Sequence, residues 1–282
     1  MKKLTITVII HTYNEEKNIK NCLESVKWAD DIVLIDNYSN DRTVEIAARY
    51  TDRIFYIERT GLAEQARKFA VDQAQNEWVL VVDADEMVPP LMKLKLESIV
   101  NQDLGDVVSI PHNNYFFGSK MERTGWGPLQ DTHLRFYKKS CVNLSQKVHS
   151  EPELSESARI FSITNPDEGF VHFNYFDVEQ FIEKMNRYTS IEAVGLYKAG
   201  EDLNSRQLFF QVFGEFKLRY FSFKGYKEGF TGLSMSLMMA AYRLTVLMKL
   251  KLMRNYSSDK PRAEVRKEYQ KIADSIIGEY EK

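Results

Sequence analysis

Four short, mostly apolar segments alternate with segments of helical periodicity over the first 82 residues, and this alternation leaves few folds open to the chain. The apolar segments are rich in β-branched residues and resemble buried strands of a parallel sheet; they lie at 4–10, 31–36, 53–57 and 78–82. Apolar residues recur at helical spacing between them, at 19–26, 44–50 and 62–74. The pattern predicts an α/β fold with a mostly parallel sheet and helices on both of its faces.

Composition is ordinary for a globular protein and excludes several classes of function. The 282 residues are 44% hydrophobic and 28% charged, so disorder, collagen and a simple coiled coil are excluded. The net charge of −2 gives no global field for nucleic acid, and we expect no nucleic-acid partner. Cys22 and Cys141 are far apart in the sequence, zinc motifs are absent, and no apolar signal segment follows Met1, which together predict a cytoplasmic protein.

Three loops are expected at the edge of the sheet where ligands bind. In open α/β sheets ligands sit beyond the carboxyl ends of the strands, which here are followed by residues 11–16, 36–41 and 83–86. Neither a Gly-x-Gly-x-x-Gly fingerprint nor a P-loop motif is present. A nucleotide at this edge would therefore be held by side chains, with its phosphates neutralised by a metal ion.

The loop after the fourth expected strand reads Asp83-Ala84-Asp85-Glu86. Side chains two apart on an extended segment point the same way, so Asp83 and Asp85 can converge on one cation or bracket a ribose and a metal. Carboxylate oxygens favour Mg²⁺ or Mn²⁺, and Mg²⁺ is commonly held by one or two carboxylates together with substrate phosphates. The alternative is a solvated turn before the helix that starts at Pro90.

Four motifs in the first 110 residues, in order along the chain, resemble the inverting GT-A glycosyltransferases of family 2. They are VIIHTYNEE at 8–16, Ile35-Asp36 with SNDRT at 39–43, Gln65-Ala66-Arg67 with Ala74, and VDAD at 82–85. The resemblance implies a GT-A (Rossmann-like) fold, a nucleotide-diphosphate sugar as donor, with UDP favoured, and Mg²⁺ or Mn²⁺ as cofactor.

The resemblance also implies roles for individual residues. The nucleoside is expected to contact Asp36 and four residues of the first loop, Thr12, Tyr13, Asn14 and Glu15. Arg67 is expected near the base or the phosphates, Asp83 near the ribose, and Asp85 on the metal. The family usually has Asp-Asp-Gly-Ser-x-Asp in the second loop, and this chain departs from it at Asn37 and Tyr38.

An inverting transfer needs a group that takes a proton from the acceptor hydroxyl. The resembled family has a Glu-Asp pair followed by an Arg near this point, with the Asp as base; here Gln130-Asp131 and Arg135 occupy that place. Asp131 is therefore the first candidate for the base, with a structural cap as its alternative, and His133 is the second. Arg135 and Trp126 are expected on the acceptor or sugar side, although a Trp in a Gly-rich loop is equally often core.

Two further histidines follow apolar residues, His149 in KVHSE and His172 in VHFNY. Both suit a metal or phosphate role, His149 more than His172, and the alternative is an imidazole hydrogen-bonded in the core. The segments around them, with 181–189, are similar to the lipopolysaccharide-core-type glucosyltransferases of bacteria. That branch usually has Val-His-Glu, and Ser150 before Glu151 departs from it.

The last third of the chain is predicted to be helical, giving a catalytic domain at 1–200 and an extension at 201–282. Residues 229–242 carry no charge, but 14 residues fall short of the roughly 20 that cross a bilayer, so an interfacial or buried helix is expected. Aromatic residues at 209–226 are interleaved with Lys and Arg, as on surfaces that bind anionic lipid. The alternative is a helical core or a homodimer face.

These observations predict an inverting hexosyltransferase on the inner face of the cell membrane. The acceptor would be a hydroxyl of an envelope glycolipid or polysaccharide. One rival is a catalytically silent scaffold that binds nucleotide sugars at the membrane. A second, nucleotidyl transfer on a sugar phosphate, would normally bring a Gly-rich basic first loop, which is absent.

Overall fold

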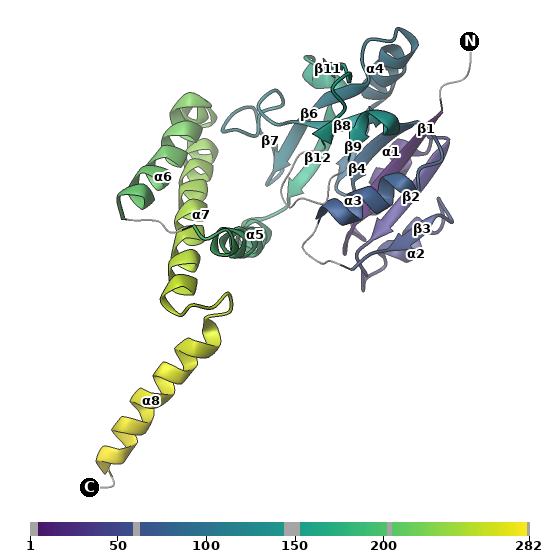
Figure 1. Ribbon diagram of the computed structural model, residues 1–282. Helices are drawn as coiled ribbons and strands as arrows, with labels where there is room; N and C mark the ends of the chain where they lie inside the picture. Colours follow the sequence, from purple (N-terminus) through teal and green to yellow (C-terminus); the bar gives the residue numbers. More distant parts are fainter. Residues whose placement is uncertain (1–4, 59–62, 144–152, 202–204, 281–282) are drawn as a thin grey trace. The chain divides into compact units, whose positions relative to one another are not determined.

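The computed structural model describes residues 5–58, 63–143, 153–201 and 205–280. The chain divides into two compact units, Met1–Phe176 (unit 1) and Asp177–Lys282 (unit 2). Figure 1 labels their helices and strands along the chain.

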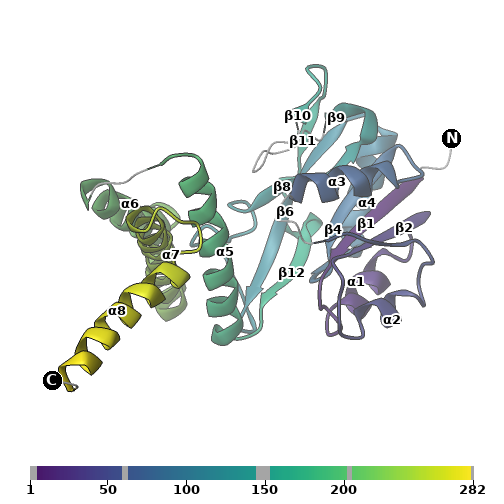
Figure 2. The same ribbon diagram turned by 60° about the horizontal axis from the view of Figure 1, so that its bottom comes forward.

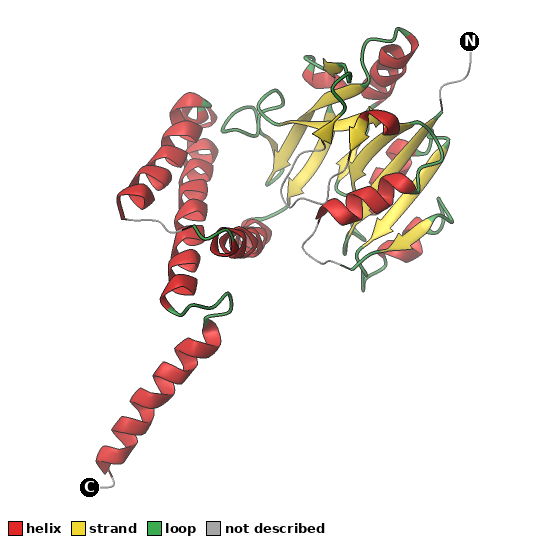
Figure 3. Cartoon of the chain, viewed as in Figure 1, coloured by secondary structure: helices red, strands yellow, loops and turns green. Residues whose placement is uncertain are grey.

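Unit 1 is built on a large mixed sheet that has ten strands among the described residues, drawn in yellow in Figure 3. Its main path runs β3-β2-β1-β4-β8-β6-β12-β5, and β7 and β11 pair with β6. The strands are β1 (Ile6–Thr12), β2 (Asp31–Asp36), β3 (Ile54–Tyr56), β4 (Trp78–Asp83), β5 (Glu86–Met87), β6 (Val107–Phe116), β7 (Ser119–Lys120), β8 (Thr132–Lys138), β11 (Ile160–Ser162) and β12 (Phe170–Tyr175). A separate ribbon pairs β9 (Val142–Asn143) with β10 (Glu153–Leu154).

The four strands predicted from the sequence are β1 to β4, and they pair in parallel with one another. Beyond β4 the sheet becomes mixed, because β8 runs antiparallel to both β4 and β6. The registers of β1 with β2 and with β4 bring Thr12, Asp36 and Asp83 to the same edge of the sheet. The three loops expected at the ligand edge therefore do share that edge.

Helices cover both faces of the sheet, as predicted. Alternate residues of β1 point to opposite faces, so Val8 and Ile10 pack with α1, α2 and α4, whereas Ile9 packs with the end of α3 and the residues after it. Figure 2 shows α3 apart from α1 and α2. The helical elements of unit 1 are α1 (Ile19–Val26), α2 (Thr43–Ala47), α3 (Ala63–Asp72), α4 (Pro90–Asn101) and the 3₁₀ turns η1 (Lys139–Cys141) and η2 (Pro166–Glu168).

Unit 2 is helical among its described residues. Its elements are α5 (Val178–Lys198), α6 (Ser205–Lys217), the π-helical segment η3 (Leu218–Ser222), the 3₁₀ turn η4 (Gly225–Glu228), α7 (Gly229–Asn255) and α8 (Arg262–Tyr280). Helix α7 packs against α5 and α6, with Ala193, Val246 and Met253 buried between helices. The division falls at residues 176/177, ahead of the predicted 200/201, because α5 packs on α7 and so belongs with the helical unit.

Helix α7 is longer than its uncharged sequence run indicated. The helical stretch 225–255 contains an 18-residue window with a mean hydropathy of 1.2, and it is long and apolar enough to cross a membrane by length and composition. Arg243, which interrupts the apolar run, is paired with Glu192 of α5 at 2.7 Å. About a third of the most apolar window is buried within the protein, so core packing accounts for part of its apolar character.

Two glycines of unit 2 provide a matched test of this packing. A Cβ on Gly232 of α7 would lie 1.9 Å from the carbonyl oxygen of Gly225, whereas one on Gly214 of α6 would meet no atom within 4 Å. We expect Gly232→Ala to lower the free energy of unfolding by about 1–3 kcal/mol, because backbone must move. Gly214→Ala should raise it by up to about 1 kcal/mol through helix propensity. Urea denaturation measures both; equal effects would contradict the packing of α7 on η4.

Candidate active site

The first two loops at the ligand edge are joined by hydrogen bonds. The backbone NH of Asn14 donates to the Ser39 hydroxyl at 2.9 Å, and the Asn14 side-chain oxygen accepts from the backbone NH of Asn40 at 2.9 Å. The backbone NH of Glu15 donates to the Thr43 hydroxyl at 2.8 Å. Asn14 has a positive φ of 54°, a conformation that Asn tolerates better than most residues. The predicted loops therefore form one surface.

Side chains at this surface differ in how far they are already engaged. Thr12 is buried, and its hydroxyl has no hydrogen-bond partner among the described residues. Tyr13 is 39% exposed. Asp36 is fully buried, and its carboxylate accepts from the backbone NH of Ser39 at 2.8 Å and from its hydroxyl at 2.5 Å. Asp36 thus shapes the loop, and the expected nucleoside contacts of Thr12 and Tyr13 stay predictions.

The second loop shows why this chain can depart from the family motif. Tyr38 stands where the family usually has Gly, and its φ is +59°, in the left-handed region that favours Gly. Its ring is 58% exposed and lies 5.6 Å from the ring of Tyr56. Tyr38 therefore adopts a backbone conformation that favours Gly, and its ring adds an aromatic surface beside the loop.

Two other residues are predicted to contact the nucleotide, Glu15 and Arg67. A carboxylate oxygen of Glu15 accepts from the side-chain amide of Asn18 at 2.7 Å, so Glu15 helps to start α1. Arg67 belongs to α3, but its side chain lies outside the described part of the protein. Its expected role therefore stays a prediction.

Asp83 ends β4 and is held by Arg135 of β8. The guanidinium lies 2.7 Å from an Asp83 carboxylate oxygen and 3.6 Å from Glu86, whose side chain is fully buried. Burial acts to raise the pKa of Asp83, but the charge and hydrogen bond of Arg135, together with the charges of His11 and His172, hold it well below its usual value. Arg135 therefore lies against the carboxylates of Asp83 and Glu86, and its expected role on the acceptor or sugar side stays a prediction.

Asp85 lies beside His172 of β12. The His172 Nε2 is 3.5 Å from an Asp85 carboxylate oxygen, and both side chains are more than 80% buried. Burial acts to lower the pKa of His172, but its hydrogen bond with Asp85 raises it above the usual value. The sequence favoured His149 over His172; His149 lies outside the described residues, whereas His172 is brought to the expected metal ligand.

Asp131, the expected base, lies just before β8 and is fixed on both carboxylate oxygens. One is 2.9 Å from the His133 ring and the other accepts from the Asn114 side-chain amide at 2.7 Å. Burial acts to raise the pKa of Asp131, but the hydrogen bonds from His133 and Asn114 lower it to about 2. Asp131 is therefore ionised at neutral pH and can accept a proton.

The depressed pKa predicts how Asp131 contributes to stability as pH changes. Its ordinary value is 3.8 and its folded value about 2, so ionised Asp131 stabilises the fold by about 2 kcal/mol at neutral pH. This contribution is present above pH 4 and is lost as pH falls toward 2. We expect the stability difference between wild type and Asp131→Asn to shrink over that interval in urea denaturation at stepped pH. A difference independent of pH would contradict the assignment.

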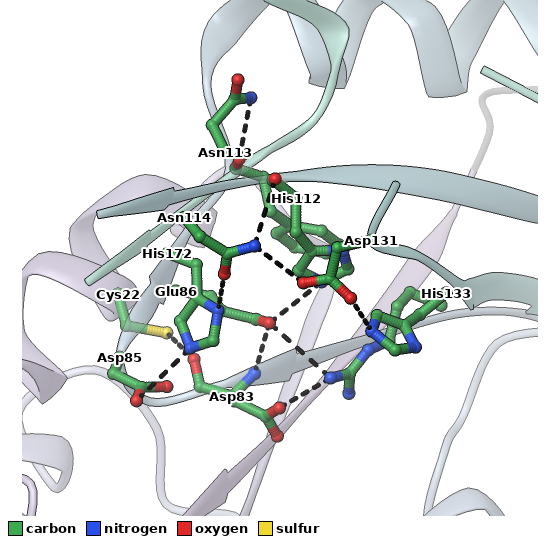
Figure 4. Close-up of polar contacts among 12 residues, drawn as sticks. Cys22, Asp83, Asp85, Glu86, His112, Asn113, Asn114, Asp131, His133 and His172 are labelled. Atoms are coloured by element: carbon green, nitrogen blue, oxygen red, sulfur yellow. Dashed lines mark hydrogen bonds and ion pairs between the residues drawn. The ribbon is translucent and has the colours of Figure 1, made fainter. Parts of the chain in front are cut away.

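Asn114 joins the two groups, as Figure 4 shows. Its side-chain NH₂ donates to Asp131 and to the Trp126 carbonyl oxygen at 3.0 Å, and its oxygen faces His172 Nδ1 at 2.8 Å. Because that oxygen only accepts, Nδ1 carries the hydrogen, and Nε2 is turned toward Asp85. Side chains from β6, β8, β12 and the loop after β4 thus form one continuous polar network.

Trp126 is half-buried, and its ring packs at an angle on Phe116 with centroids 5.0 Å apart. Its carbonyl oxygen holds Asn114, so the Gly-rich loop around it supports the network through its backbone. Its expected role on the acceptor or sugar side stays a prediction.

Sequence reasoning missed two members of the network, His112 and Asn114. Glu86 and His112 form a buried pair with Nε2 and Oε1 3.1 Å apart, and Asn114 is fully buried. His112 also packs on Phe170, with ring centroids 5.0 Å apart. The signal was the polar run His112-Asn113-Asn114 in the middle of β6, whose side chains are otherwise mostly apolar and buried.

The donor set is compatible with a divalent ion held partly by the substrate. No group of three or more His, Cys, Asp or Glu side chains is arranged for a metal among the residues that the structure describes. Asp85 and His172 supply two ligands of suitable type, an oxygen and an Nε2 whose tautomer is fixed from behind by Asn114. Such a pair fits an ion whose remaining ligands are phosphate oxygens and water.

Comparison with known proteins places the chain in a family. The sequence model "Glycosyl transferase family 2" matches residues 7–148, just over half of the 282. An uncharacterized glycosyltransferase of Rickettsia typhi, RT0209, is 28% identical over 266 residues, covering 89% of this chain and 87% of the relative. The lipopolysaccharide core biosynthesis glycosyltransferase LpsC of Rhizobium meliloti is 25% identical over 256 residues, covering 88% and 92%.

Among solved structures, TarS residues 1–349 of S. aureus match with a TM-score of 0.43 and 17% identity, covering 95% of this chain and 92% of that one. The family match and the observed sheet and helices confirm the expected GT-A architecture with a C-terminal helical extension. The chain belongs to glycosyl transferase family 2.

Proposed function

We propose that the protein transfers a hexose from a nucleotide-diphosphate sugar, with UDP as the favoured nucleotide, to an acceptor hydroxyl, with inversion at the anomeric carbon. The observation that carries the proposal is the convergence of Asp85 and Asp131 on one hydrogen-bonded network at the ligand edge of the sheet. Asp85 would hold the metal ion at the donor diphosphate, and Asp131 would take the proton from the acceptor hydroxyl.

The nucleoside would lie on the joined first and second loops. The Thr12 hydroxyl is buried without a partner among the described residues, and a ribose or base atom would satisfy it. The partly exposed ring of Tyr13 offers a stacking surface for the base. Asp83, which ends β4 and is held by Arg135, would accept from the ribose hydroxyls.

Mg²⁺ or Mn²⁺ would be held by Asp85 and His172 and would neutralise the charge on the diphosphate. The chain's own contribution would be a carboxylate oxygen and an imidazole Nε2 that face each other at 3.5 Å. Asn114 keeps the ring oriented with Nε2 toward Asp85.

Asp131 would act on the acceptor. The acceptor oxygen forms a bond to the anomeric carbon while the bond from that carbon to the diphosphate breaks, and the hydroxyl proton passes to a carboxylate oxygen of Asp131. His133 and Asn114 each occupy one lone pair of that carboxylate, which leaves others to receive the proton. With a pKa of about 2, Asp131 is a weak base, so its position and ionisation matter more than its basicity.

We propose an envelope glycolipid or polysaccharide as the acceptor class and a cytoplasmic location at the inner face of the membrane. The likeness to a relative named for lipopolysaccharide core biosynthesis, which extends over 88% of the chain, supports this acceptor class.

A thermal-shift panel tests the donor. UDP-, GDP-, dTDP- and CMP-sugars are compared with Mn²⁺ and with EDTA. A ligand at 100 times its Kd adds about 2.7 kcal/mol of stability, or about 5–10 °C in Tm for a protein of this size. The proposal expects such a shift with a UDP-sugar and Mn²⁺ together, and product formation when glycolipid is added. Binding without transfer to any acceptor would favour the silent scaffold, and no metal-dependent shift would contradict the proposal.

Unit 2 presents an apolar surface beside basic residues. On α7 the exposed apolar side chains recur at helical spacing: Phe230, Leu233, Leu237, Leu244 and Met248. Exposed Lys217, Lys224 and Lys227 lie near Phe213, Phe221 and Tyr226. Apolar side chains that enter the headgroup region, with cations on lipid phosphates, are typical of interfacial helices. We propose that this surface binds an anionic membrane.

Co-sedimentation with vesicles tests the surface. We expect binding to vesicles with 30% or so phosphatidylglycerol and weak binding to pure phosphatidylcholine, since each Lys near an anionic surface contributes about 1 kcal/mol. Replacing Lys224 and Lys227 by Gln should lower binding about tenfold or more. Equal binding to both kinds of vesicle would contradict the role of the Lys side chains. A dimer in sedimentation, without vesicle binding, would indicate that the exposed apolar side chains of α7 bind a second copy of the chain.

A further inference from the structure

The Asn114 side chain is hydrogen-bonded both to His172, which lies beside Asp85, and to Asp131. It lies in the middle of β6 and is fully buried, an unusual place for an amide unless each of its polar groups is used. Every hydrogen-bonding group of its side chain has a partner: His172 on one side, Asp131 and the Trp126 carbonyl on the other.

The orientation of the Asn114 amide is fixed by its partners. Two of them, the Asp131 carboxylate and the Trp126 carbonyl oxygen, only accept, so the NH₂ group must face them. The oxygen must then face His172, which fixes the hydrogen of His172 on Nδ1. One amide therefore determines both the tautomer of the imidazole beside Asp85 and the place of the carboxylate that receives the acceptor proton.

We propose that Asn114 is a positioning residue that holds the acceptor base Asp131 and the imidazole of His172 in one fixed arrangement. The inference rests on the proposed function for its kinetic consequences. The structural part of the inference is that one side chain positions both Asp131 and His172. This part does not depend on the reaction. Residues that orient ligands and bases from behind commonly change affinity or activity by about 10–100-fold when replaced.

Asn113 provides a matched control on the same strand. It is also buried, but strand alternation turns it to the other face, where its amide donates to the carbonyl oxygens of Pro166 and Phe170 at 2.8 and 3.0 Å. Replacing it removes a buried amide that makes two hydrogen bonds through its NH₂ group, and it leaves the hydrogen bonds of Asn114 in place. Figure 4 shows the two amides directed apart.

The experiment compares Asn114→Asp, Asn114→Ala and Asn113→Ala in the full chain. Asn114→Asp keeps an oxygen acceptor for His172 and replaces the donor to Asp131, so we expect UDP affinity in Mn²⁺ to stay within about threefold while kcat falls about 10–100-fold. Asn114→Ala should lower both, each by about tenfold or more. Asn113→Ala should lower Tm without changing either. Equal losses in the Asn113 and Asn114 variants, or a kcat near that of wild type in folded Asn114 variants, would overturn the proposal.

A spectroscopic measurement separates this inference from the proposed function. The carboxyl ¹³C signal of Asp131 and the ring ¹⁵N signals of His172 are recorded without ligands. We expect both to move in Asn114→Ala and to stay in place in Asn113→Ala, whether or not the protein transfers sugar. Unmoved signals in a folded Asn114→Ala protein would overturn the positioning role, whereas absence of UDP binding and of transfer in wild type would contradict the proposed function alone.

Discussion

Replacing Asp131 by Asn is expected to lower kcat for sugar transfer by about 10²–10⁴-fold, the usual contribution of a positioned general base. An amide has nearly the same shape and still accepts from Asn114, but it cannot take the acceptor proton. Because the carboxylate of Asp131 is bonded to Asn114 and His133, and Asp85 is the expected metal ligand, the affinity for UDP in Mn²⁺ should change less than about threefold. Steady-state kinetics and calorimetry measure the two quantities.

His133 provides the comparison, because it is the second candidate for the base. Its side chain is 51% exposed and contacts one oxygen of Asp131, so it orients and stabilises that carboxylate. We expect His133→Gln to lower kcat by less than about tenfold, well below the effect of Asp131→Asn. The reverse order of effects would identify His133 as the base. Near-normal turnover by both variants would move the search to Glu151, which lies outside the described residues.

Asp85→Asn is expected to remove the metal dependence of donor binding and to lower transfer by about a hundredfold or more, since a metal ion supplies several kcal/mol of charge stabilisation. The substitution keeps the size of the side chain but removes the charge that faces His172 and the ion. The thermal shift by UDP-sugar with Mn²⁺ should fall to the value found in EDTA.

Glu45→Gln is the matched control for this loss of charge. Glu45 lies on α2 at the surface of the same unit, where it pairs with Arg42 and Arg49 and its side chain is 54% exposed. Its replacement should leave donor binding, metal dependence and transfer unchanged, because exposed ion pairs contribute little. Full transfer by Asp85→Asn in a metal-dependent assay would contradict the role of Asp85.

The first half of the fold could be predicted because its signal is local. β1, β2, β3 and β4 are marked by short apolar runs, and the helices between them by periodicity, so residue ranges agree within a few positions. Strand β6 gave no such signal, since its apolar pattern is interrupted by the polar run at 112–114. Its partners β8 and β12 come from later segments, and pairing over such distances depends on tertiary contacts.

The site was predictable to the extent that topology determines it. Thr12, Asp36 and Asp83 follow from the rule that parallel strands end at a common edge, and the register confirms their proximity. The partners of Asp85 and Asp131 could not be predicted from spacing, because His172 and Asn114 are 87 and 17 residues away along the chain. The carboxylates of the site can be recognised from short sequence motifs. The side chains that orient them come from distant segments of the chain, and only the fold brings these together.

The most direct test of the central claim is anomalous diffraction at the manganese edge from crystals grown with Mn²⁺ and UDP. The account predicts one strong peak between the nucleotide diphosphate, Asp85 and His172, with Asp131 facing the open side of the diphosphate. UDP bound at the loops after β1 and β2 with no manganese beside Asp85, or manganese bound away from both residues, would contradict it.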